Sequence, residues 1–94
     1  MHELKASDRE LLRDNCLGYL STRQGLLFSA GAVLRGMRGR QMIDFAADEQ
    51  DVFQALVFLQ GLGFVQQSAH ATGSTVEWQA SSAGVLHAER NLLA

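Results

Sequence analysis

The sequence predicts an α+β domain in which three helices come before a two-stranded β-hairpin and a fourth helix follows it. Apolar residues recur at helical spacing through roughly the first sixty positions. Between Phe64 and Ala80 this spacing gives way to a strand, a glycine-containing turn and a second strand. The 94 residues include no proline and no linker-like stretch. We therefore expect a single domain over residues 1–94, with residues 1–7 and 91–94 flexible.

The first two expected helices occupy the N-terminal part of the chain. Ser7 or Asp8 is placed to cap the first, which ends near Arg23. Ser29 can cap the second, which extends to about Arg40. Internal glycines weaken this second helix by about 1 kcal/mol each relative to alanine, so we expect it to be short or irregular. The residues expected to face the core are Leu12, Cys16, Tyr19, Leu20, Val33, Leu34 and Met37.

The third expected helix, residues 49–62, has the clearest start signal. Asp48 is placed to cap it, and Glu49 and Asp51 lie in its first turn, where carboxylates favour the positive end of the helix dipole. A pair of glycines ends it. Its expected buried stripe is Val52, Ala55, Leu56 and Leu59.

The hairpin and the last helix complete the chain. The segment ATGST holds Gly73 where a turn tolerates positive φ. Trp78 is expected to anchor the second strand on the helices, between Val76 and Ala80 on the same face. Ser81 or Ser82 then caps the last helix, whose expected apolar contacts are Val85, Leu86, Ala88 and Leu92 or Leu93.

Two stretches resemble a known superfamily. VFQALVFLQGLGFV resembles the third helix of winged-helix proteins and its exit into the wing. VEWQASSAGVLHAE is similar to the return strand and final helix of the ArsR-like and MarR-like groups, where a hydroxyl cap, two residues and a glycine follow the strand. The layout is most like the small winged-helix proteins of Mu-like bacteriophages. The resemblance implies a winged helix-turn-helix fold and a DNA-binding transcriptional regulator of phage or bacterial type.

Composition limits the other possibilities. The formal charge of −2 gives no support to nucleic-acid binding, since dedicated binders are usually basic. Cys16 is the single cysteine, which excludes a disulfide framework and a thiolate metal cluster. The charged N-terminus is unlike a signal peptide, and no run approaches the roughly 18 apolar residues of a membrane span. We expect a cytoplasmic protein with no cofactor and no metal.

Duplex DNA is the first expected partner, because the third helix of such families enters the major groove. Glutamines on its outer side can pair with adenines. Arginines in LRGMRGRQ can grip phosphate if they face the same way, and the wing offers neutral donors. The candidate DNA-binding residues are Arg35, Arg38, Arg40, Gln50, Gln54 and Gln66.

A protein partner is the alternative. Residues 49–62 contain no lysine or arginine. Apolar Phe53, Val57 and Phe58 are expected near the outer side of this helix and are better suited to a protein than to a hydrated groove. The domain would then act in a phage assembly, a regulatory complex or as an inhibitor of a host protein. A competing interpretation places both phenylalanines in the small core.

Self-association is expected through the first and last helices, which carry more apolar residues than one stripe needs. In winged-helix domains these helices commonly lie side by side, away from the third helix. Leu17 and Leu86 are the candidate contacts of a two-fold homodimer.

Catalysis is not expected. The chain has no Gly-x-Ser-x-Gly, no phosphate-binding loop and no histidine pair at helical spacing. Cys16 and His87 are conceivable as nucleophile and base but lack a third, orienting group. His70, near the expected turn, is interpreted as an exposed loop residue.

Overall fold

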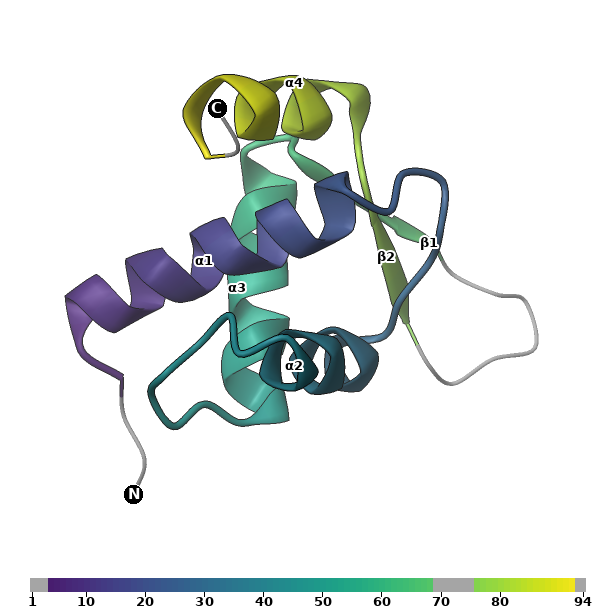
Figure 1. Ribbon diagram of the computed structural model, residues 1–94. Coiled ribbons are helices and arrows are strands. Elements are labelled where there is room, and N and C mark those ends of the chain that lie inside the picture. The colour runs from purple at the N-terminus through teal and green to yellow at the C-terminus, as the bar shows by residue number, and fades with distance from the viewer. Residues whose placement is uncertain (1–3, 69–75, 93–94) are drawn as a thin grey trace.

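The computed structural model describes residues 4–68 and 76–92, and it confirms the predicted α+β class (Figure 1). Figure 1 shows α3 crossing behind α1, with α2 and α4 at opposite ends of α3 and the hairpin to one side. Within the described part of the chain, every helix is too short or too polar to cross a membrane. In chain order the elements are α1 (Ala6–Ser21), α2 (Ala30–Gly39), α3 (Glu49–Gly61), β1 (Val65–Ser68), β2 (Glu77–Ala80) and α4 (Ser82–Asn91).

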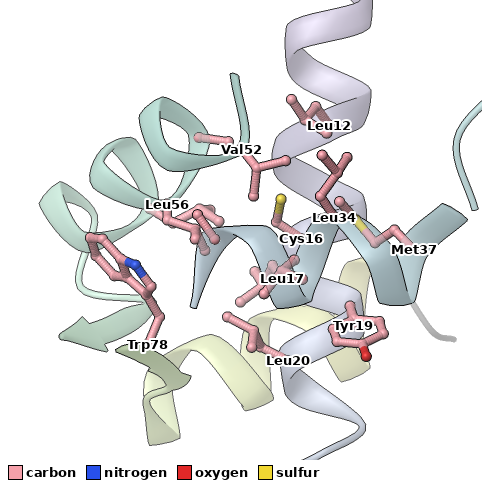
Figure 2. Close-up of a cluster of buried hydrophobic side chains, with 14 of the residues drawn as sticks. Leu12, Cys16, Leu17, Tyr19, Leu20, Leu34, Met37, Val52, Leu56 and Trp78 are labelled. Atoms are coloured by element: carbon pink, nitrogen blue, oxygen red, sulfur yellow. The ribbon is translucent and has the colours of Figure 1, made fainter. Parts of the chain in front are cut away.

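α1 is the central element of the core, because it packs against the three other helices and against β2. Its buried side chains include Leu12, Leu17 and Leu20, which Figure 2 shows directed toward those neighbours. The expectation that α1 lies away from the third helix is wrong, since α1 packs directly against α3.

α1 begins earlier than the sequence signals indicate. Lys5 stands at its N-cap and makes no side-chain cap, so the predicted caps at Ser7 or Asp8 are wrong. The reason is tertiary: Leu4 is buried in the core, and the Arg9 guanidinium donates to its carbonyl at 2.7 Å. These contacts fix the chain just before the helix, within the segment expected to be flexible.

α2 and α3 begin where the sequence predicts. Ser29 Oγ accepts a hydrogen bond from the backbone N–H of Ala32 at 3.2 Å, and Asp48 caps α3. α2 is a regular helix of ten residues despite its glycines. The connection between the two helices, residues 40–48, is long for a helix-turn-helix, and the Arg38 guanidinium holds its far end by donating to the carbonyl of the buried Ala47.

The hairpin pairs β1 with β2 antiparallel, Val65 opposite Ala80. A further β-bridge, not predicted from the sequence, joins the α1–α2 connection to β2. Phe28 N–H donates to the Trp78 carbonyl at 2.9 Å, and Trp78 N–H donates to the Phe28 carbonyl at 2.8 Å. The predicted turn at Gly73 lies outside the described residues.

Trp78 is the largest fully buried side chain and confirms its predicted place as an anchor. Figure 2 shows its indole between the hairpin and α3, on the side where Leu56 lies. Because its backbone is bonded to Phe28, the same residue ties the hairpin to the helices through both main chain and side chain.

α4 is placed by Ser81 and Gly84. Ser81 Oγ accepts from Gly84 N–H at 3.0 Å and donates to the Gly63 carbonyl at 2.6 Å, so Ser81, rather than Ser82, is the cap. Gly84 packs on the Phe64 carbonyl, which would lie 1.9 Å from an added Cβ. Of the apolar contacts predicted for this helix, Ala88 is fully buried and Leu92 packs on the core, but Leu86 is 47% exposed.

Gly84→Ala should therefore destabilise the fold by about 1–3 kcal/mol, because the new methyl group overlaps a backbone carbonyl that cannot move freely. Gly39→Ala is the matched control: its Cβ would meet nothing within 4 Å, so the higher helix propensity of alanine should leave stability unchanged or slightly raised. Urea unfolding followed by circular dichroism measures both, and equal effects of the two substitutions would contradict the packing described for α4.

Candidate functional site

α3 turns one side to the core and the other to solvent. The buried side carries the four residues predicted for it: Val52, Ala55, Leu56 and Leu59. On the outer side Gln50 and Gln54 are exposed, as predicted. Phe53 and Val57 accompany them, with 38% and 45% of their surfaces exposed. We call Glu49, Gln50, Phe53, Gln54 and Val57 the α3 face.

Phe53 and Val57 form the apolar part of the α3 face. They stand four residues apart on a helix and are therefore neighbours along its surface. The Phe53 ring meets the Trp78 ring edge to face, with centroids 5.9 Å apart and an interplanar angle of 79°. The structure thus lies between the two predicted interpretations of Phe53: it contacts the core tryptophan and still presents part of its ring to solvent.

Phe58 lies on the other flank of α3. The Arg13 guanidinium sits over its ring, 3.7 Å from the centroid, and comes from α1. Phe58 remains 44% exposed, so it is not a core residue, but one side of its ring is already covered by a cation. The apolar surface predicted for Phe53, Val57 and Phe58 is therefore divided between two flanks of the helix.

Carboxylates surround the start of α3. Asp48 Oδ1 accepts from Asp51 N–H at 2.9 Å, and Asp51 Oδ2 accepts from Asp48 N–H at 3.0 Å. A helix N-terminus attracts anions, and here the protein's own carboxylates take that position. Beside this end of the helix is a hollow lined by Ala30, Asp48, Glu49, Gln50 and Phe53.

Glu49 also reaches the start of α2. Its Oε1 lies 2.7 Å, and Arg35 Nη1 lies 3.4 Å, from the position of a Cβ built on Gly31, the second residue of α2. Both helices of the helix-turn-helix pair therefore begin next to a carboxylate. The sequence shows no pattern that predicts this approach, apart from the small size of Gly31.

The three candidate arginines do not form one patch. Arg35 and Arg38 are exposed and three residues apart on α2, so they lie on neighbouring positions of its surface. Arg38 is turned toward the Ala47 carbonyl. Arg40 follows the end of α2 and instead lines a hollow at α1 together with Arg23, so the condition for a shared phosphate grip is met by two arginines only.

Gln66 is exposed on β1, opposite Gln79, as a wing residue should be. His70 falls outside the described residues.

Of the two predicted homodimer contacts, one is buried and the other is exposed. Leu17 is 1% exposed, which makes it a core residue, so its assignment to an interaction surface is wrong. The reason is that α1 is surrounded by α2, α3, α4 and β2 and needs more than one apolar stripe. Leu86 remains exposed, as does Leu11.

Cys16 is fully buried, and His87 lies on α4 against Phe64. Burial raises the pKa of the Cys16 thiol to about 12, which disfavours the nucleophilic thiolate. His87 stacks on Phe64 with centroids 4.4 Å apart, and the Asn91 side-chain amide lies 3.3 Å from its Nδ1. Among the described residues, no group of three histidine, cysteine, aspartate or glutamate side chains is arranged to hold a metal ion.

Comparison with known proteins adds one solved structure. No protein-family model and no curated protein matches the chain. A structure from a study of the DNA recognition and protein interaction domains of HOP2 superposes with a TM-score of 0.60 at 18% identity, covering 74% of this chain and 98% of that one. At this identity the likeness concerns the fold alone. The fold is that of a winged helix. This likeness confirms the winged-helix architecture predicted from the sequence. Phe28 adds a single β-bridge to β2, at Trp78.

Cys16 should be inert to thiol reagents in the folded protein at pH 8 and reactive once urea unfolds the chain, as Ellman's reagent would measure. Above about pH 9 the unfolded chain releases the thiol proton while the folded protein keeps it, so stability should fall as pH rises. The thiol accounts for about 1.4 kcal/mol of loss between pH 8 and pH 10. Because other groups titrate there, Cys16→Ala is the reference, and an identical pH dependence in both proteins would refute this assignment.

Proposed function

We propose that this winged helix is a protein-interaction module that binds its partner through the α3 face. The observation that supports this proposal is the chemistry of α3, whose exposed side combines Phe53 and Val57 with Glu49 and has no lysine or arginine. A winged helix that reads DNA places this same side in the major groove.

The electrostatics of this end of the domain oppose a polyanion. Asp48, Glu49 and Asp51 lie at or near the N-terminal ends of α3 and α2, which are the positions where helix dipoles otherwise favour phosphate. A protein partner, in contrast, gains from the apolar surface. Burying the whole of a valine or phenylalanine side chain contributes about 1.5–3 kcal/mol, and Phe53 and Val57 still have roughly two fifths of that surface to bury.

Duplex DNA is the second candidate. Gln50 and Gln54 point outward from α3, and Arg35 and Arg38 share an exposed part of α2. The study of the similar HOP2 structure concerns both DNA recognition and protein interaction. If this candidate holds, the protein is a transcriptional regulator of phage or bacterial type. The narrower resemblance to the winged-helix proteins of Mu-like bacteriophages is part of this second candidate. A cytoplasmic location and the absence of catalysis stay predictions under both candidates.

Titration against a labelled mixed-sequence duplex separates the two candidates. At about 50 mM salt we expect no binding up to about 100 μM protein, the range in which non-specific DNA binders associate. Binding that weakens steeply at about 200 mM salt would overturn the proposal in favour of DNA.

If the duplex does bind, arginine variants show which part of the domain holds it. Arg35→Ala with Arg38→Ala should weaken it and flatten its salt dependence, whereas Arg40→Ala alone serves as the control, because Arg40 lies at the α1 hollow.

We also propose a homodimer whose contacts include the exposed Leu11 of α1 and Leu86 of α4 in place of the buried Leu17. Sedimentation equilibrium at about 100 μM, above the micromolar range of ordinary dimers, should show a dimer that Leu86→Asp splits. Leu17→Asp tests folding instead, because that side chain is in the core. A single monomeric mass for the unchanged protein would rule the homodimer out.

A further inference from the structure

We propose that the partner of the α3 face is an amphipathic protein segment that places a lysine or arginine in the hollow beside Phe53 and an apolar side chain, one helical turn away, on Val57. This inference rests on the proposed function and names the chemistry of the partner. It follows from the order of charge and apolar surface along α3.

The hollow is suited to a cation. Its lining includes two acidic residues, Asp48 and Glu49, and one aromatic residue, Phe53. A cation held there lies close to negative charge and to an aromatic residue, and both favour it. Arg35 approaches Glu49 from the α2 side, so the incoming cation competes with one cation of the protein itself.

Two of the protein's own arginines already lie over aromatic rings. The Arg13 guanidinium lies 3.7 Å above Phe58, which is half exposed, and the Arg23 guanidinium lies 3.8 Å above Tyr19, which is buried. Among the residues that the structure describes, no guanidinium covers Phe53 in this way. We infer that the partner supplies the cation that the fold itself supplies at the other two rings.

The spacing defines the partner's pattern. Phe53 and Val57 are one turn apart, so a segment lying along α3 meets the hollow first and the exposed 45% of Val57 next. A helix with a basic residue and an apolar residue at i and i+3 or i+4 presents both on one side. Gln50 and Gln54 lie along the same side and can bond to the polar rim of such a segment.

Selection of displayed random 16-residue peptides against the intact protein tests this pattern. We expect enriched peptides to carry lysine or arginine three or four positions from a leucine, isoleucine or phenylalanine. For synthetic copies, Glu49→Lys and Val57→Ser should each weaken binding about tenfold, because one introduces like charge and the other removes the apolar contact. Circular dichroism confirms that each variant is folded.

The matched controls are Glu89→Lys, the same charge change on α4, and Leu26→Ser, which alters another exposed apolar residue, in the α1–α2 connection. Both control variants should bind the peptides with unchanged affinity. Peptides that need Val57 but are not basic, and that ignore Glu49→Lys, would overturn the partner chemistry and leave the proposed function standing. Peptides indifferent to both α3 variants, or no enrichment at all, would overturn the proposed function as well.

Discussion

Trp78 joins the wing, α3 and the α1–α2 connection through a single residue. Its backbone exchanges two hydrogen bonds with Phe28, its strand pairs with β1, and its buried ring supports Phe53 on α3. Trp78 therefore helps to set the position of α3 relative to the wing, alongside the direct packing of α3 on β1. In a chain of 94 residues, where the core is small, such a contact carries a large share of the stability.

The residues that start the helices also shape what the surface can bind. Asp48 and Asp51 each accept a hydrogen bond from the other's backbone N–H at the start of α3, and Glu49 lies against the start of α2. The same carboxylates make this end of the helix pair unfavourable for phosphate and favourable for a basic segment. The caps thus set both the local stability of α3 and the charge of the surface beside it.

The sequence predicts those features that local signals determine. Ser29, Asp48 and Ser81 mark the helix starts correctly, because a capping side chain acts within three residues of its own position. The start of α1 is missed because the burial of Leu4 decides it. The approach of Glu49 to Gly31 and the separation of Arg40 from Arg35 depend on how α2 and its connection pack, which periodicity does not encode.

The contact between Gly84 and the Phe64 carbonyl has a consequence for how the sequence can diverge. Any side chain at this position pushes α4 away from Phe64, just before β1. Loss of the Ser81 hydroxyl leaves both the Gly63 carbonyl and the Gly84 N–H without their bond. Serine and glycine three residues apart are thus constrained by geometry, whichever partner the domain binds. Distant homologues that share little overall identity should retain this pair after the second wing strand, whereas the exposed Gln50 and Gln54 of α3 carry no such packing constraint.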